Sequence, residues 1–253
     1  MASATSLSEE RIARLPKYAG VKVVTSLFDW HQLGETSWNW NVNPAAMQEL
    51  ASVGGRIQSF SGHLSDKIIL KLLAAQMEQS NRRSALLAHY QQVINCIAVF
   101  VPDNVRLHHK LNLTIDADSS HPEALTVVTV MGSNSRLSLN QDIEVSGMAN
   151  CVSVIVDGTV GTSSQLNATT IVRSRQQVDM TIVANQELSA KASNNWSVMA
   201  ATKGALLGDV KVNLNQAGSR AELSTLGISE DQEVGLPTEV NHLAPHTVSK
   251  VNV

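Results

Sequence analysis

Hydrophobic and polar positions follow two different patterns along the chain, and the change falls near residue 95. After Asn95 the sequence consists of short runs rich in Val, Ile and Thr, such as IAVFV, LTVVTV and CVSVIV, separated by turns of Gly, Asn, Ser and Asp. Runs of this length and composition are typical of β-strands. They recur every 10 to 18 residues without a strict period. The pattern predicts a β-rich domain over residues 94–253.

The preceding residues follow a helical pattern. Asn43-Pro44, the run AAMQELASV and then Gly54-Gly55 supply a helix start, a helical body and a glycine stop, which predicts a short helix. From Ser65 the apolar residues recur at spacings of three and four, which predicts one or two amphipathic helices ending near residue 93. We therefore expect an α-rich N-terminal segment over residues 1–93. The Trp-rich stretch DWHQLGETSWNWN is expected to anchor a loop onto the body, with a binding patch as the alternative.

The distribution of aromatic residues indicates what kind of β-domain follows. Eight of the nine aromatic residues lie at or before Phe100, and only Trp196 lies after it. An immunoglobulin-like sandwich usually has an aromatic-anchored core, whereas a β-solenoid fills its interior with stacked small aliphatic side chains. The sequence therefore favours a solenoid, with a two-sheet sandwich as the alternative. The N-terminal segment is expected to pack against one end of it.

Charge and cysteine content exclude several function classes. The net charge is −3, divided into +2 over the first hundred residues and −5 over the rest, and no segment concentrates positive charge. Nucleic acid and acidic membranes are therefore not expected as partners. The first twenty residues contain no apolar signal region, no run is long enough to span a membrane, and the two cysteines lack metal-ligand spacing. We expect a cytoplasmic protein with Cys96 and Cys151 buried as structural residues.

A few residues outside the apolar runs could carry chemistry. His108 and His109 are adjacent between predicted strands. In an extended chain their rings would point to opposite faces, so they could not bind one metal ion together. Ordinary surface histidines are the simpler interpretation. Asp116 and Asp118 would share one strand face, which could serve a Ca²⁺ site or glycoside cleavage, but a solvated loop before the turn SSHP is the favoured interpretation. Nucleotide-binding and common hydrolase motifs are absent from the sequence. Three Asn-x-Ser/Thr sequons are interpreted as chance, at Asn112, Asn167 and Asn195.

Near the C-terminus, His242 and His246 flank Pro245 in a predicted turn between strands. Such a pair could bind a metal, but a structural position is the default expectation.

This segment, HLAPHTVS over residues 242–249, resembles a stretch of SufB and SufD proteins that reads H-L-A-P-x-T-x-S. The similarity extends diffusely over residues 60–253. SufB and SufD are paralogous scaffold subunits of an iron–sulfur cluster assembly complex that also contains the ATPase SufC. The resemblance implies a right-handed parallel β-helix, which agrees with the solenoid expected from the pattern. The motif residues that it marks are His242, Pro245, His246, Thr247 and Ser249.

Two departures from the family pattern refine the expectation. Family members continue past this motif into further coils and C-terminal helices that dock the ATPase, whereas this sequence stops at Val253, so it resembles a shortened member. A strand position where SufB members can carry a functional cysteine aligns loosely with Val212, which makes the chain closest to SufD.

The function expected from the resemblance is that of a SufD-like scaffold subunit without catalytic residues. Its partners would be SufB-like and SufC-like subunits, and the complex rather than this chain would handle the iron–sulfur cluster. Self-association through the C-terminal coil, around Val248, Val251 and Val253, is also expected. A β-helix enzyme acting on polysaccharides and a surface adhesin are the alternatives.

Overall fold

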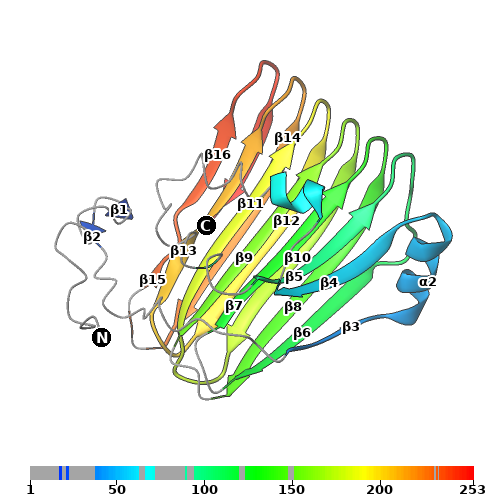
Figure 1. Cartoon of the computed structure of the whole chain (residues 1–253). Coiled ribbons are helices and arrows are strands. Elements are labelled where there is room, and N and C mark those ends of the chain that lie inside the picture. The colour runs from blue at the N-terminus through cyan, green and yellow to red at the C-terminus, as the bar shows by residue number, and fades with distance from the viewer. Residues whose placement is uncertain are drawn as a thin grey trace.

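From Ile94 onward the chain alternates between two sheets, and each sheet is extended by parallel pairing as the chain advances (Figure 1). The structure, a computed structural model, describes residues 17–18, 21–22, 38–62, 66–71, 89, 94–119, 123–147, 151–230, 232 and 234–253. Neighbouring strands of one sheet are separated in the chain by a strand of the other sheet, so that two strands make one coil. The result is a β-solenoid of about five turns, which confirms the predicted architecture over the sandwich.

The strands divide between the two sheets as follows. Sheet 1 contains, in spatial order, β15 (Val234–Gly235), β13 (Leu206–Leu214), β11 (Asp179–Leu188), β9 (Cys151–Val160), β7 (Glu123–Met131), β5 (Ile94–Val101) and β4 (Arg56–Gly62), and β16 (Thr238–His242) also pairs with β13. Sheet 2 contains β17 (Val248–Asn252), β14 (Arg220–Ser229), β12 (Ser193–Thr202), β10 (Gln165–Ser174), β8 (Arg136–Gly147), β6 (Leu111–Ser119) and β3 (Trp38–Val42). A separate antiparallel pair is formed by β1 (Lys17–Tyr18) and β2 (Val21–Lys22).

Aliphatic side chains from both sheets fill the interior between them. Ile115, Ile143, Val172 and Ala200 occupy one register position in four successive strands of sheet 2, and all four side chains are buried. Because each inward residue stacks on its counterparts in the adjacent coils, no large aromatic is needed to bridge the sheets. Each buried Ile or Val contributes about 1.5–3 kcal/mol relative to an exposed side chain.

A left-handed residue marks the turn that leads from sheet 1 into sheet 2 in successive coils. Its φ lies between 56° and 76° at each position, and the spacings between positions are 30, 29, 28, 27 and 28 residues. The coil length therefore varies, which explains why the sequence shows no strict period. The residues are Asn104, Asn134, Ser163, Lys191, Gly218 and His246.

Residues from the N-terminal region close the first coil. β3 pairs antiparallel with β6 and β4 pairs antiparallel with β5, and between them α2 (Pro44–Ser52) buries Ala46 and Leu50 against the core. The helix is as predicted, but the Asn43 side chain bonds to the backbone of Lys110 and Asn112 instead of capping it. The two strands were not predicted.

The Trp-rich stretch and the predicted second helical region lie only partly within the described residues. Trp38 and Trp40 belong to β3 and pack against the main core, as expected for anchoring rings. Residues 67–71 are helical. The rest of the predicted helical segment, up to residue 93, lies outside the described residues apart from His89.

The outward side of sheet 1 carries a second, smaller core. Ile69 packs there with Cys96, Ala98, Phe100 and Val128. His89 is buried beside the same sheet, with Nδ1 2.7 Å from Ser153 Oγ and Nε2 3.0 Å from Thr126 Oγ1. Burial lowers the pKa of His89 to about 3, so the ring is neutral at physiological pH. Residues from the N-terminal region thus cover part of one face of the solenoid.

Candidate functional site

The five motif residues of the sequence analysis lie together in the last turn and the strands beside it. His242 ends β16, Pro245 and His246 lie in the turn, and Thr247 and Ser249 lead into and begin β17. His246 has a φ of 60° and takes the left-handed position of this coil. The carbonyl of Pro245 accepts a hydrogen bond from the Gly218 amide of the preceding coil at 3.3 Å. The motif is therefore the last copy of the repeated turn.

The His242 ring bridges two hydroxyl groups across this turn. Nδ1 lies 2.7 Å from Thr247 Oγ1, and Nε2 lies 2.9 Å from Ser249 Oγ. Thr247 donates its own proton to the Ala244 carbonyl at 3.1 Å, so it must accept from Nδ1–H of His242. A neutral His242 then accepts from Ser249 at Nε2. Both ring nitrogens therefore make contacts across this turn.

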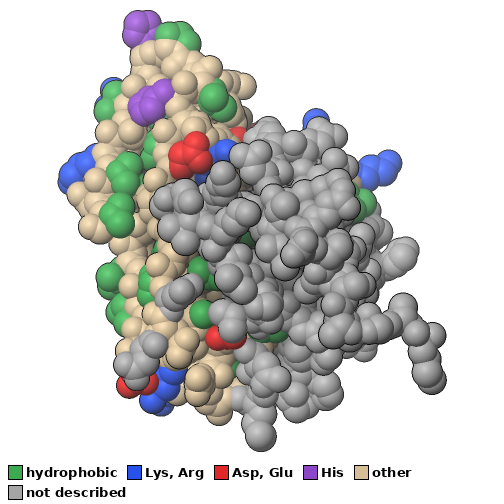
Figure 2. Space-filling view, turned by 90° about the vertical axis from the view of Figure 1, so that its left-hand side faces the viewer, with side chains coloured by type: hydrophobic (Ala, Val, Ile, Leu, Met, Phe, Trp, Pro, Cys, Tyr) green, Lys and Arg blue, Asp and Glu red, His purple; other side chains and the backbone are tan. Residues whose placement is uncertain are grey.

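The last coil also exposes apolar side chains. Among the ten exposed large hydrophobic residues in the described part of the chain, seven lie between Leu226 and Val253. Figure 2, which looks onto the left-hand side of Figure 1, shows hydrophobic side chains spread down this end of the solenoid below exposed histidines. Exposed apolar groups gathered in one region are typical of an interaction surface. They are Leu226, Ile228, Val234, Leu243, Val248, Val251 and Val253.

A chain of polar side chains runs through the otherwise aliphatic interior. Trp196 Nε1 donates to Thr170 Oγ1 at 3.0 Å, and Thr170 donates to Gln141 Oε1 at 2.6 Å. Ala168, the register partner of Trp196, is small enough to leave room for the indole. The sequence offered one signal for this site, because Trp196 is the only aromatic residue after Phe100. Buried networks whose members are all paired fix one arrangement of the coils.

A second polar group lies on the outward side of sheet 1. Asp157 is fully buried; its Oδ1 accepts from the Gly158 amide at 2.7 Å and from Asn185 Nδ2 at 3.4 Å. Asn185 and Asn213 also donate to Glu187 Oε1, at 3.0 and 2.6 Å. Asp157 Oδ2 makes no hydrogen bond with the described residues. Burial raises the pKa of Asp157 well above its ordinary value, so its protonated form is favoured in the folded chain.

The structure places the two thiols and the cysteine-aligned position on opposite sides of sheet 1. Cys96 and Cys151 are free and buried on its outward side, as predicted. Burial raises the pKa of the Cys96 thiol to about 12. Val212 lies inside the solenoid in β13 and is fully buried. Both thiols are therefore inaccessible, and the third position carries no thiol.

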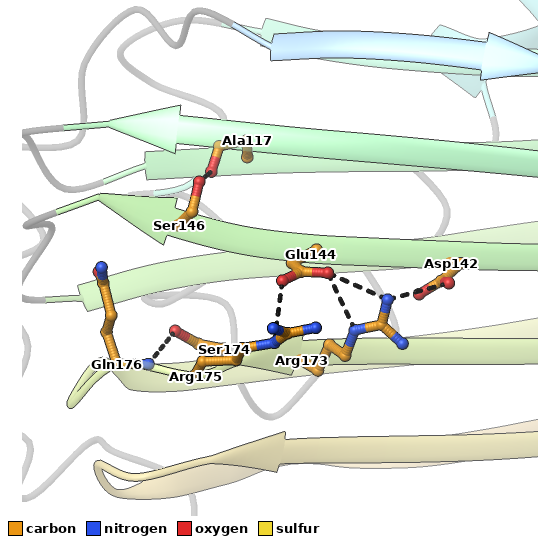
Figure 3. A network of polar contacts seen from close by, with 8 residues as sticks. All are labelled: Ala117, Asp142, Glu144, Ser146, Arg173, Ser174, Arg175 and Gln176. Atoms are coloured by element: carbon orange, nitrogen blue, oxygen red, sulfur yellow. Dashed lines mark hydrogen bonds and ion pairs between the residues drawn. The ribbon is translucent and has the colours of Figure 1, made fainter.

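The predicted acidic pair belongs to β6 rather than to a loop. Asp116 is exposed there, and its register partner is Glu144 of β8. Arg173 of β10 donates to Glu144 Oε2 at 3.0 Å and to Asp142 Oδ2 at 3.2 Å, and Arg175 Nε lies 3.4 Å from Glu144 Oε1 (Figure 3). Carboxylates of two coils thus lie on one face, and two arginines pair with those of β8, Asp142 and Glu144. The Asp118 side chain lies outside the described residues.

The adjacent histidines lie beside helix α2. Glu49 accepts the backbone amides of His108 and His109 at 2.9 Å, and His109 Nδ1 is also 2.9 Å from it. These bonds lower the pKa of Glu49 to about 2. Through these bonds to Glu49, His108 and His109 connect helix α2 to the first coil. Within the described residues, no three His, Cys, Asp or Glu side chains are close enough together to hold a metal ion.

The fold and the motif turn define a class of protein, the parallel β-solenoids whose coils are closed by a repeated left-handed turn. A sequence model of the family described as SUF system FeS cluster assembly, SufBD core domain, matches residues 113–253. The match covers more than half of the chain, and the chain therefore belongs to this family. No curated protein matches it. No helix in the described residues has the length and hydrophobicity needed to cross a membrane.

Proposed function

We propose that the chain is a SufD-like scaffold subunit of a cytoplasmic iron–sulfur cluster assembly complex, which acts by binding proteins rather than by catalysis. Membership of the SufBD core family supports the setting. The observation that carries the scaffold role is the last coil, where Leu243 and Val248 are 62% and 55% exposed. β17 and β15 are the outermost strands of their sheets in the described residues, so unpaired backbone groups accompany this apolar surface.

The positions of the thiols support a subunit that is SufD-like rather than SufB-like. The resemblance aligns Val212 loosely with the functional cysteine of SufB members, and both cysteines of the chain are buried elsewhere. These observations support a subunit that contributes no cysteine ligand of its own. The cluster is then the cargo of the whole complex.

The partners proposed for this surface are SufB-like and SufC-like subunits. Main-chain hydrogen bonds along a free strand edge, with apolar side chains beside them, suit pairing with another sheet of the same kind. A second copy of this chain is the competing occupant, because its last coil carries the same exposed edge.

Binding measurements with two variants test the role of the last coil. Leu243→Glu and Val248→Glu each place a charge on the exposed apolar surface, and each should weaken binding to a purified SufB-like subunit at least tenfold, or by about 1.4 kcal/mol. Val53→Glu is the matched control, because Val53 is 40% exposed just after α2, at the other end of the solenoid. Equal affinities for all three variants, or no binding by the unaltered chain, would contradict the proposal.

A further inference from the structure

Three arginines that are far apart in the sequence lie in one register row on the outward side of sheet 2. Arg106 is bridged to Arg136, and the row continues through Gln165 and Ser193 to Arg220. All three arginines are exposed, and none of their guanidinium groups forms an ion pair or hydrogen bond with the described residues. We call these five residues the arginine row.

The arginine row lacks the neutralisation found elsewhere on the same sheet. At the opposite ends of the strands, Arg173 is held by Asp142 and Glu144. Arg106 and Arg136, by contrast, are direct neighbours of equal charge, an arrangement that destabilises a sheet. No carboxylate belongs to the row. An anion bound along it would remove this repulsion.

A groove of about 370 Å³ runs beside the C-terminal half of the row. Amide side chains line it, from Gln165, Asn167 and Asn195, together with Arg220 at the row. The one carboxylate in its lining, Glu222, is paired with Lys250 at 2.7 Å, so Arg220 leaves the groove with a net positive charge. Amides both donate and accept hydrogen bonds, which matches a peptide backbone; a phosphate chain offers only acceptors.

The spacing of the cations fits an extended chain. Strands are about 4.8 Å apart, so Arg136 and Arg220, three strands apart, are separated by about 14 Å. Residues i and i+4 of an extended peptide span about the same distance, at roughly 3.4 Å per residue. Carboxylates at these two positions would face the two guanidinium groups. We propose that the arginine row and its groove, which shares only Val248 with the apolar surface of the last coil, bind an extended acidic segment of a partner protein.

Fluorescence anisotropy with a labelled ten-residue peptide of alternating Asp and Ser tests this site on the intact chain. We expect saturable binding at low salt that weakens as salt rises, and a loss of at least tenfold in affinity for the double variant Arg136→Gln, Arg220→Gln. Lys203→Gln is the control and should bind as the unaltered chain does, because Lys203 pairs with Glu230 away from the row. The charge reversal Arg136→Glu, Arg220→Glu should instead bind the matching Lys-Ser peptide.

Three results would overturn the proposal. The first is absence of saturable binding by the unaltered chain, and the second is equal or tighter binding of inorganic polyphosphate, which would assign the row to phosphate groups. The third is a dimer of the unaltered chain that the double variant abolishes, because the occupant would then be a second copy. Melting temperatures within a few degrees of the unaltered chain would show that the exposed substitutions leave the fold intact.

Discussion

At the scale of single residues, Asp157 has the environment least suited to its ordinary charged form. It is fully buried on the outward side of sheet 1, and one carboxyl oxygen makes no hydrogen bond within the part of the chain that the structure describes. Because the pKa of Asp157 is raised in the folded state, the folded chain keeps a proton that the unfolded chain loses above about pH 4. The free energy of unfolding therefore falls as pH rises from that value toward the folded-state pKa.

Asp157→Asn removes the titrating carboxyl, and with it the loss of stability at higher pH. The amide oxygen can still accept both hydrogen bonds that Oδ1 accepts. We expect the variant to be more stable than the unaltered chain by more than about 1 kcal/mol at pH 7, with the gain disappearing near pH 4. Urea unfolding across this pH range measures the difference, and the titration of His89 cancels because both proteins contain it. Asp116→Asn, on an exposed carboxylate, should change stability little at any pH. An effect of Asp157→Asn that does not vary with pH would refute the raised pKa of Asp157.

The two thiols are expected to be unreactive for the same reason of burial. Cys96 and Cys151 are 0% and 2% exposed, and the pKa of Cys96 is about 12, so almost no thiolate is present at pH 8. An Ellman-type reagent should label neither cysteine within minutes in the folded chain and both in denaturant. Labelling of either thiol at the rate of a free cysteine in native buffer would contradict the placement.

At the scale of elements, the repeated left-handed turn is the feature that sequence reading could recognise least. Its occupants include Asn, Ser, Lys, Gly and His, so no single residue type reveals the repeat. Most strands of the solenoid were predictable, because Val, Ile and Thr are frequent in them. β3 and β4 were not, since the five residues WNWNV are too short to distinguish a strand from an anchored loop.

Gly218 isolates the energetic contribution of this turn. Its φ is +76°, and an added Cβ would meet nothing closer than Lys191 Cγ at 3.4 Å, so the backbone conformation alone opposes a side chain. Gly218→Ala should lower the free energy of unfolding by about 1–2 kcal/mol. Lys191→Gly, at the same position one coil earlier, should have the opposite sign or no effect, and thermal unfolding measures both. An unchanged stability of Gly218→Ala would show that the turn tolerates other conformations.

At the scale of the whole molecule, the polar sites depend on contacts between distant coils. The alternation of β8 places Asp142 and Glu144 on one face, but only the pairing of β8 with β10 brings Arg173 to them. The arginine row likewise joins residues 30 and 84 positions apart, from Arg106 to Arg136 and from Arg136 to Arg220. The burial of Asp157 could not be foreseen either, because a strand pattern does not show which outward face will be covered.

The most direct test of the central claim is native mass spectrometry of the tagged chain after co-expression with SufB-like and SufC-like subunits from the same genome. The scaffold account predicts a complex that contains this chain together with both subunits, and loss of the SufB-like subunit from it on Leu243→Glu but not on Val53→Glu. Recovery of the unaltered chain alone, or only as a dimer of itself, with both subunits expressed and folded would contradict the account.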